Sequence, residues 1–476
     1  DHLLVRNIVT WNALIAGYAE FGCGNEALEC YNKMHKETSL VPNEVTFACL
    51  LKACGSIGSV EKGEEIHSEI SKRGLLRSSI VLGNSLVDMY IKCGMLTKAI
   101  EAFNELVRRD VVSWTTLLCG YGQHGLDDET LKCYERMQHE GVQPDAVTFC
   151  CILKSCGNNG LVEKGEEIHA EVRKKGLLLT KDVALHTALV YMYAKCGSLS
   201  KARQVFDEIS IHDSISWNAL IAGYAQNGLN DEALNCFQQM RYDCLSPSSS
   251  TFALVLSASG CLGSAKQGQE IHAEIIMRGL LEHSITLGNA LVDMYFKCGL
   301  PVMAQEVFEK LPERDNLSWN ALITGYAQLG HVNRVFISFT EMMAEGIVPN
   351  VITFVLLLTA CSYAGLVDEG QMCLDNMSTN YSLAPTLEHY TSLVDLLSRA
   401  GCFIKAIILI KTIPTSDRHR LWWVLLGASL RWVNLTVAKW VFEHCMELDG
   451  NDASTYICMS NIYADASMQG EFHCPS

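Results

Sequence analysis

A phrase of about twelve residues occurs four times in this chain, and its regular spacing limits the possible folds more than any other feature. The copies begin at Trp11, Trp114, Trp217 and Trp319, and read WNALIAGYAEFG in the first case. They are 103, 103 and 102 residues apart. Two further phrases, EKGEEIHSE and LVDMYIKCG in their first copies, recur with the same period. Three phrases with one long period predict a chain built from repeated structural modules.

Each module divides into three segments of 31 to 36 residues, and every segment has two helical stretches separated by a glycine-containing break. In the first segment Leu14, Ile15 and Tyr18 form one stripe, and Asn25 after the break suits a helix N-cap. Spacings of three and four residues are helical. Each segment is therefore predicted to be a helix-turn-helix hairpin. One hairpin cannot bury its own stripe, so the expected fold is all-α, a right-handed α-solenoid of stacked hairpins.

The same phrases define the expected organisation of the chain. Residues 1–7 are predicted to be the tail of a truncated repeat, and residues 8–418 to form twelve repeats. Residues 419–476 are expected to form an incomplete helical extension. The four triplets of repeats are 8–110, 111–213, 214–315 and 316–418.

Composition narrows the classes of function. The chain has 37 Lys and Arg against 53 Asp and Glu, a formal charge of −16. This excess disfavours binding of nucleic acid by bulk phosphate neutralisation, but leaves base-by-base readout open. None of the 21 cysteines forms a Cys-x-x-Cys pair, so we expect reduced, mostly buried thiols. The longest apolar runs, 351–361 and 421–430, are too short to span a bilayer, so no membrane association is expected.

The phrases and segment lengths resemble those of plant pentatricopeptide-repeat (PPR) proteins. They are most similar to the PLS subgroup, in which ordinary, long and short repeats alternate. After residue 418, the stretches at Trp422 and Tyr456 resemble the E-type helical extension of organellar RNA-editing factors. The extension departs from its usual pattern around 431–434 and is incomplete at residue 476. The resemblance implies a location in the mitochondrion or chloroplast.

For this family the resemblance implies that the fifth and the last residue of a repeat together read one RNA base. The candidate pairs are Asn12 with Asn43, Asn84 with Asp110, Thr115 with Asp145, Thr187 with Asp213, Asn218 with Ser248, Asn289 with Asp315, and Asn320 with Asn350. It further implies that Asn-Asp favours U, Thr-Asp favours G, and Asn with Ser or Asn favours a pyrimidine, usually C. Ionised Asp only accepts hydrogen bonds, which suits uracil and guanine. The alternative is that these short polar residues simply cap helices.

Two further positions belong to the same hypothesis. The second residues of the ordinary repeats are predicted to sandwich a base, with core packing as the alternative; they are Val9, Val112, Ile215 and Leu317. The fifth residues of the long repeats neither donate nor accept well, so these repeats are expected to be spacers or weak readers. These residues are Ala48, Cys150, Ala253 and Val355.

Three copies of His-x-Glu, at His67, His169 and His272, match the opening of a zinc deaminase signature. The Pro-Cys-x-x-Cys element of that signature is missing, and recurrence at the module period marks the copies as a repeat feature. We therefore expect no metal, no cofactor and no catalytic residue, and predict half-buried helical histidines.

The tryptophans also have a structural and a functional interpretation. Those of the ordinary repeats are expected to pack between helices rather than stack on bases. Four more crowd the end of the chain: Trp422, Trp423, Trp432 and Trp440. For these we expect a terminal-cap core, with an exposed partner-binding face as the alternative.

The expected function is sequence-specific binding of single-stranded RNA, one base per repeat, which specifies a site for organellar C-to-U editing by a separately supplied deaminase. Expected partners are single-stranded organellar RNA and, through the C-terminal extension, a deaminase-bearing or editing-accessory protein. One alternative, favoured by the charge of −16, is a helical-repeat scaffold for protein interactions. Another is a fragment of a longer editing factor that carries its own deaminase domain. The paired Asn/Thr and Asp/Asn/Ser pattern favours RNA, because a generic scaffold has no reason to keep it.

Overall fold

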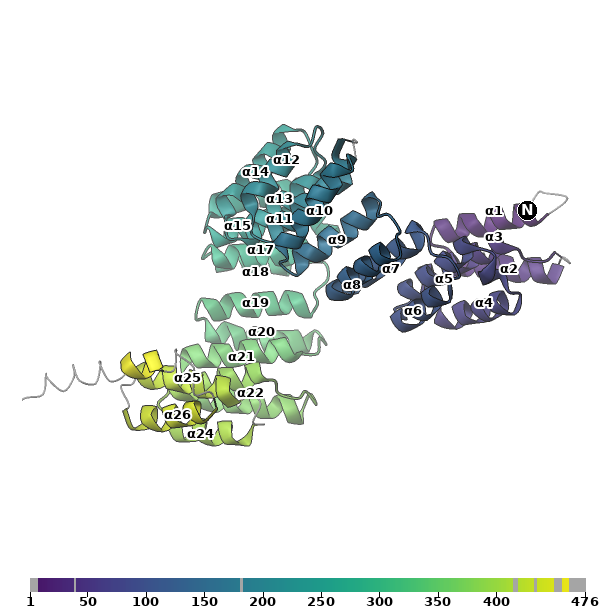
Figure 1. Ribbon diagram of the computed structural model, residues 1–476. Helices are drawn as coiled ribbons and strands as arrows, with labels where there is room; N and C mark the ends of the chain where they lie inside the picture. Colours follow the sequence, from purple (N-terminus) through teal and green to yellow (C-terminus); the bar gives the residue numbers. More distant parts are fainter. Residues whose placement is uncertain are drawn as a thin grey trace, which may run out of the picture. The chain divides into compact units, whose positions relative to one another are not determined.

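The computed structural model describes residues 7–37, 40–179, 183–413, 418–431, 435–448 and 456–461. Regular structure in these residues is entirely helical, with no strand among them (Figure 1). The helices belong to two compact parts, Asp1–Ser246 (the N-terminal part) and Pro247–Ser476 (the C-terminal part). Residues 1–6 of the predicted truncated repeat and 462–476 of the predicted extension lie outside the described residues.

Helices of the N-terminal part form consecutive hairpins. Their bounds are α1 (Ile8–Glu20), α2 (Gly24–Glu37), α3 (Glu44–Ile57), α4 (Val60–Lys72), α5 (Ile80–Lys92), α6 (Leu96–Glu105), α7 (Val111–Gln123), α8 (Asp127–His139), α9 (Ala146–Asn158), α10 (Val162–Lys174), α11 (Val183–Lys195), α12 (Leu199–Asp207), α13 (Ser214–Gln226) and α14 (Asn230–Tyr242). Short 3₁₀ helices, η1 (Leu75–Arg77) and η2 (Leu177–Leu179), follow α4 and α10.

The C-terminal part continues the same alternation. Its helices are α15 (Ser249–Cys261), α16 (Ala265–Met277), α17 (Ile285–Lys297), α18 (Pro301–Glu309), α19 (Asn316–Gln328), α20 (Val332–Ala344), α21 (Val351–Ala364), α22 (Val367–Thr379), α23 (Leu387–Arg399), α24 (Phe403–Thr412), α25 (Arg418–Arg431) and α26 (Leu435–Leu448). A 3₁₀ helix, η3 (Leu280–His283), follows α16.

The first helix of each hairpin packs on the first helix of its neighbours. In the N-terminal part α1, α3, α5, α7, α9, α11 and α13 contact one another in this order, and in the C-terminal part α15, α17, α19, α21, α23 and α25 do so. Each first helix also contacts its own second helix, as α1 contacts α2. The prediction of an all-α solenoid of stacked hairpins is confirmed.

A glycine in the left-handed conformation ends the first helix of several hairpins. Gly58 follows α3 with φ of 66°, and its N–H donates to the carbonyl oxygens of Cys54 and Gly55. Residues with a Cβ rarely adopt this conformation, which explains the glycine in the break between the two helical stretches.

The second and third recurring phrases meet in space. A Cβ on Gly63 would lie 2.5 Å from the sulfur of Met89, so glycine is needed where α4 approaches α5. Four residues after Gly63, His67 contacts Tyr90 through Nδ1 and the phenol oxygen, 2.9 Å apart. The same glycine–methionine and histidine–tyrosine contacts recur with the module period, at Gly165, Met192, His169 and Tyr193 and at Gly268, Met294, His272 and Tyr295.

The tryptophans of the first phrase are buried, as predicted. Trp114 packs edge-on against Phe103 of the preceding hairpin, with ring centroids 4.8 Å apart. Trp217 and Trp319 make the equivalent contact with a phenylalanine at 4.5 and 4.7 Å. These tryptophans join successive hairpins and are not available for base stacking.

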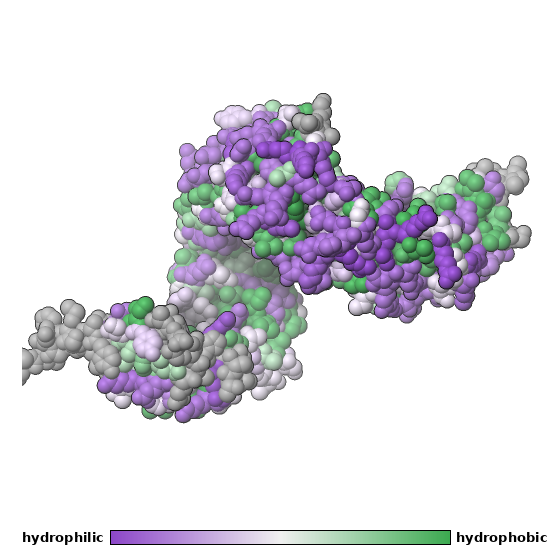
Figure 2. All heavy atoms as spheres, in the orientation of Figure 1, coloured by the Kyte–Doolittle hydropathy of each residue, from purple (hydrophilic) through white to green (hydrophobic). Residues whose placement is uncertain are grey.

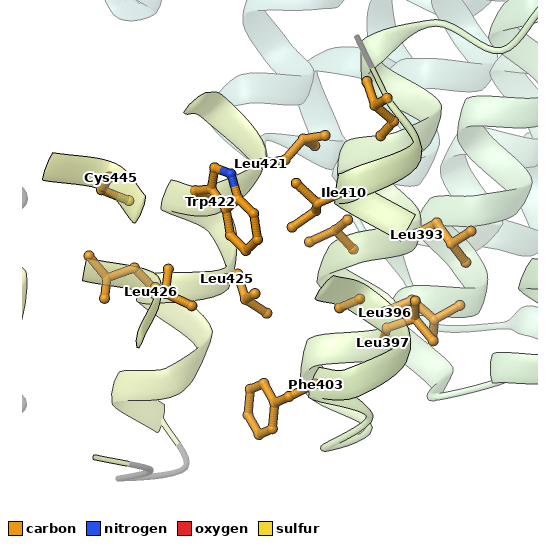
Figure 3. Packing of buried hydrophobic residues seen from close by; sticks show 14 of the residues in the cluster. Leu393, Leu396, Leu397, Phe403, Ile410, Leu421, Trp422, Leu425, Leu426 and Cys445 are labelled. Carbon is orange, nitrogen blue, oxygen red and sulfur yellow. The ribbon is translucent and has the colours of Figure 1, made fainter. Parts of the chain in front are cut away.

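An apolar cluster closes the C-terminal part. Figure 3 shows Trp422 and Leu425 of α25 on the side that faces Ile410 of α24. Trp422 is 3% exposed and packs against Trp440 of α26, whereas Trp423 is 37% exposed. The terminal-cap core is therefore correct for Trp422, and Trp432 lies outside the described residues.

The cysteines within the described residues are free thiols, and apart from Cys244 and Cys261 they are buried or half-buried. This agrees with the prediction that they serve mainly in packing. Within the same residues, no helix is both long and apolar enough to cross a membrane.

Candidate nucleic-acid interface

The last residue of each predicted reading repeat is the N-cap of the next first helix. Asn43 has extended backbone angles, and its Oδ1 accepts a hydrogen bond from the backbone N–H of Thr46 at 3.0 Å. The Thr46 hydroxyl accepts in return from the backbone N–H of Asn43, which completes a capping box. The same arrangement, with Thr or Ser three residues after the cap, occurs at Asp110, Asp145, Asp213, Ser248, Asp315 and Asn350. The capping interpretation is thus correct for the last residues.

Capping does not account for the fifth residues. They lie inside the first helices, and their side chains contact the N-cap of the first helix in the next hairpin. Asn12 is 8% exposed, and its Nδ2 donates to Oδ1 of Asn43 at 3.0 Å. The Thr46 hydroxyl donates to Oδ1 of Asn12 at 2.7 Å. In the C-terminal part Asn320 repeats this geometry, donating to Asn350 at 3.4 Å. Fifth and last residues therefore form one polar site in these repeats.

The pair Asn84 and Asp110 joins an amide to a carboxylate. Nδ2 of Asn84 donates to Oδ1 of Asp110 at 3.4 Å. Burial alone would raise the pKa of Asp110, but hydrogen bonds from the backbone and hydroxyl of Ser113 and from Asn84 together lower it below its usual value. Asp110 therefore stays ionised and remains an acceptor only.

Thr115 reaches its partner through an intermediate hydroxyl. The hydroxyl of Thr148 donates to the Asp145 carboxylate at 2.7 Å, because that group only accepts. The Thr115 hydroxyl lies 2.8 Å from the Thr148 oxygen and donates to it. Thr115 keeps a lone pair that is free to accept, as a guanine N–H would require.

The remaining three predicted pairs differ from these four. The Thr187 hydroxyl and both amide atoms of Asn289 are buried without a hydrogen-bond partner among the described residues, while Asp213 and Asp315 act as caps. Asn218 belongs to the N-terminal part and Ser248 to the C-terminal part, so this pair is divided between the two.

The second residues of the ordinary repeats do not pack in the core. Val9, Val112, Ile215 and Leu317 are 54% to 67% exposed, so the core-packing alternative is wrong. Figure 2 shows apolar side chains on the surface, interspersed with hydrophilic ones. Exposed apolar groups that recur at a fixed repeat position are suited to contact a flat apolar face.

One cleft is lined by residues at the second, fifth and last positions of the repeats. It has a volume of about 350 Å³ and is lined by Val112, Thr115, Asp145 and Val147 among others. Val112 and Val147 are the second residues of consecutive repeats, and Thr115 with Asp145 is a predicted reading pair. The volume is in the range of small-molecule sites. Two exposed apolar side chains with a polar pair between them form a slot suited to a planar polar ring.

The first helices, which carry the fifth residues, have no net charge of their own. The twelve first helices from α1 to α23 carry six acidic and six basic residues: Glu20, Glu44, Asp88, Asp293, Glu388 and Asp395 against Lys52, Lys92, Lys154, Lys195, Lys297 and Arg399. The acidic excess therefore lies outside the first helices, and it includes the predicted last residues Asp110, Asp145, Asp213 and Asp315.

The fifth residues of the long repeats differ from the reading pairs. Ala48, Cys150, Ala253 and Val355 are half-buried on the same face of the first helices. None carries an amide or a hydroxyl. The long repeats thus lack the polar site that the ordinary repeats have.

The three histidines of the His-x-Glu copies are half-buried helix residues that contact tyrosine. Burial lowers the pKa of His67, His169 and His272, which favours the neutral ring. In the part of the chain that the structure describes, no three His, Cys, Asp or Glu side chains are grouped as metal ligands.

Sequence reasoning missed the hydroxyl at the third position of the following repeat. Thr46, Thr148 and Thr353 each contact the fifth residue of the preceding repeat. A signal was present, because Thr or Ser follows every predicted last residue by three positions.

Comparisons with known proteins identify the repeats. The sequence profile of the PPR repeat family matches residues 6–56, 109–158, 212–259 and 314–362, and that of the PPR repeat matches residues 45–75, 84–111, 147–177, 185–212, 289–316 and 388–416. The structure of maize PPR10 in complex with an 18-nt psaJ RNA element superposes with a TM-score of 0.64. It covers 96% of this chain and 71% of that one at 19% identity, which shows a shared fold.

Relatives in Arabidopsis thaliana extend along nearly the whole chain. A mitochondrial pentatricopeptide repeat-containing protein is 34% identical over 98% of this chain and 67% of its own length. A chloroplastic one is also 34% identical, over 98% of this chain and 57% of its own length. The chain thus spans between 57% and 67% of these two relatives. Its repeated hairpins, matched profiles and relatives together place the chain in the pentatricopeptide-repeat family.

Proposed function

We propose that the chain binds single-stranded RNA in a sequence-specific manner, with one base read by each ordinary or short repeat. The observation that carries this proposal is the hydrogen bonding of fifth residues to last residues, as between Asn12 and Asn43 at 3.0 Å. A structural cap needs only the last residue. A fifth residue that joins it from another helix creates a two-residue polar site, which a base edge can address.

The cleft at Thr115 suggests how a base is bound. The ring lies between Val112 and Val147, which cover its two faces, and its edge meets Thr115 and Asp145. Asp145 accepts, and Thr115 has an acceptor lone pair because its proton is given to Thr148. Two acceptors fit the N1–H and N2–H₂ donors of guanine, in agreement with the expected preference of Thr-Asp for G.

The base order follows from the chain if the repeats read RNA from 5′ to 3′. The seven pairs then specify pyrimidine, U, G, G, C, U and pyrimidine, with an unspecified base at each long repeat. The resulting site is Y-n-U-G-n-G-C-n-U-Y.

We further propose the finer assignment to the PLS subgroup, with an E-type extension that recruits a separate deaminase for C-to-U editing. Repeats of alternating length and the helices α25 and α26 support it. The mitochondrial and chloroplastic names of the relatives support an organellar location. PPR10 in its complex with RNA supports the class of ligand.

Binding measured against a matched pair of RNAs tests the proposal. One RNA carries the predicted site, and the other carries the same bases in scrambled order. We expect gel-shift titration to give an affinity at least ten-fold higher for the predicted site, roughly one correct base contact. Equal affinities would contradict the proposal. They would favour the alternative of a scaffold for protein interactions, which the acidic excess outside the first helices supports.

A further inference from the structure

Threonine at the third position of a following repeat fixes the amide of the preceding fifth residue. The Thr46 hydroxyl has one hydrogen and two nearby acceptors, Oδ1 of Asn12 at 2.7 Å and Oδ1 of Asn43 at 3.0 Å. The shorter contact takes the hydrogen. Thr353 is placed in the same way, 2.8 Å from Oδ1 of Asn320. In both repeats the amide oxygen is turned toward the next helix.

Serine occupies the third position after the short repeats, and it bonds differently. The Ser113 hydroxyl donates to the Asp110 carboxylate at 2.9 Å, and Ser318 makes the same bond to the cap of α19. Neither contacts a fifth residue. As a result, Oδ1 of Asn84 is buried without a partner among the described residues. Asn289, which is 7% exposed, has no partner there for either amide atom.

The two arrangements present different groups to a base. With its oxygen held by Thr46 and one N–H given to Asn43, Asn12 has its second N–H left to offer. A donor suits the N3 and O2 acceptors of cytosine. The carbonyl oxygen of Asn84 is buried and has no hydrogen-bond partner among the described residues, so it is left to accept from N3–H of uracil once the side chain turns toward the base.

We propose that the third residue of the following repeat is an additional determinant of base choice. Threonine there, beside an asparagine cap, locks the preceding asparagine as a donor and favours C, whereas serine beside an aspartate cap leaves the carbonyl of the preceding asparagine without a partner and favours U. The inference rests on the proposed function, and it adds a residue outside the fifth and last positions to the recognition site. For the ordinary repeats that contain Asn12 and Asn320, the fifth and last residues predict only a pyrimidine. The third-position threonine narrows that prediction to C.

Thr46→Val tests this proposal because it removes the hydroxyl and keeps the shape of the side chain. Ser56→Ala is the matched control, since it removes a hydroxyl of the same helix α3 that bonds the carbonyl oxygen of Ala53 and belongs to no reading pair. Affinities are measured for RNAs that differ only by C or U at the first base, read by Asn12, or at the third base, read by Asn84. Loss of one hydrogen bond in Thr46→Val should move the C-to-U ratio at the first base toward U by about five-fold.

Ser56→Ala should leave the ratio at the first base within about two-fold. A second variant, Thr46→Ser, keeps a hydroxyl beside the amide cap Asn43 and should keep the wild-type ratio at the first base. Circular dichroism and thermal unfolding establish that each variant is folded.

The possible outcomes separate this inference from the proposed function. If Thr46→Val lowers affinity for the C and U RNAs equally, Thr46 only caps α3 and the inference is wrong. If the wild-type protein distinguishes bases at the third position but no Thr46 variant changes the ratio at the first, again only this inference fails. If the wild-type protein distinguishes no base at any reading position, the proposed function itself fails.

Discussion

The side-chain amide of Asn84 donates a hydrogen bond to the carboxylate of Asp110, 26 residues later in the chain, at 3.4 Å. Asp110 at the same time caps α7 through the backbone N–H of Ser113. A single carboxylate thus ends one repeat, starts the helix of the next, and joins the fifth residue of its own repeat. The capping and reading interpretations of the last residue are therefore compatible, because these bonds all go to Oδ1, and Oδ2 of the same carboxylate can accept from a base.

The most local prediction concerns Asn84. Asn84→Thr turns the pair with Asp110 into Thr-Asp, and should move the preference at the third base from U toward G. Direct base contacts of this kind are worth on the order of 1–3 kcal/mol. Gel-shift titration against RNAs with U or G at that base measures the change. The sixth base, read by Thr187 and Asp213, should be unaffected because repeat arrays behave nearly as sums of neighbours. An equal loss of affinity for both RNAs would show that Asn84 has only a structural role.

Asp110 allows the two roles of a last residue to be measured apart. Asp110→Asn keeps a good N-cap, so the free energy of unfolding should hardly change, while the preference at the third base moves from U toward C. Asp110→Ala removes the cap and should cost about 1 kcal/mol of stability as well as base discrimination. Denaturant unfolding and RNA titration are run on both variants. A preference for U that survives in Asp110→Asn would exclude Asp110 from base reading.

Val112 should matter for RNA and hardly for stability. It is 54% exposed, so Val112→Asp should change the free energy of unfolding little. Affinity should fall by a similar factor for all four bases at the fourth position, because the side chain covers the face of the ring. Trp114→Ala is the contrast: Trp114 is fully buried, and its truncation should cost about 3–5 kcal/mol. Unchanged RNA affinity in Val112→Asp would remove the second position from the site.

The repeated histidines predict an acid-sensitive fold. Burial lowers the pKa of His67, His169 and His272 below the value of 6.5 expected when unfolded. Between these two values the unfolded chain binds more protons than the folded one, so the free energy of unfolding falls as the pH drops below about 6.5. Below the folded pKa values the decrease levels off.

Urea unfolding between pH 7.5 and 5 measures this dependence. A triple variant, His67→Gln with His169→Gln and His272→Gln, should show a shallower decrease than the wild-type protein, because glutamine does not titrate. His139→Gln, at an exposed position of α8, is the matched control and should keep the wild-type slope. A triple variant with an unchanged slope would mean that other groups cause the acid sensitivity.

The sequence by itself determined the repeat architecture. The period of 102 to 103 residues, the helical spacing of apolar residues and the glycine breaks all have local causes, namely helix periodicity and the conformational freedom of glycine. The choice of the fifth and last positions came from the resemblance to the PPR family, and the recurring phrases placed them in register along the chain. Whether those residues read RNA remains a prediction.

Only the tertiary structure decided which sides of the first helices are free. A first helix such as α3 contacts α1, α2, α4 and α5, so apolar residues occur nearly all round it. Periodicity alone therefore did not distinguish exposed Val112 from buried Trp114, two positions further on. The distinction depends on where neighbouring hairpins come into contact.

The hydrogen-bond partners of the third-position hydroxyls could likewise not be predicted from the sequence. Thr46 and Ser113 stand at equivalent positions and both belong to capping boxes, yet one reaches Asn12, 34 residues away, and the other bonds only within its own cap. The contact with Asn12 depends on how closely α1 and α3 pack, whereas Ser113 donates to the carboxylate of its own cap, as Thr148 does at Asp145. The sequence thus determined which residues line the surface, and the packing of adjacent hairpins decided which of their donors and acceptors are left for a ligand.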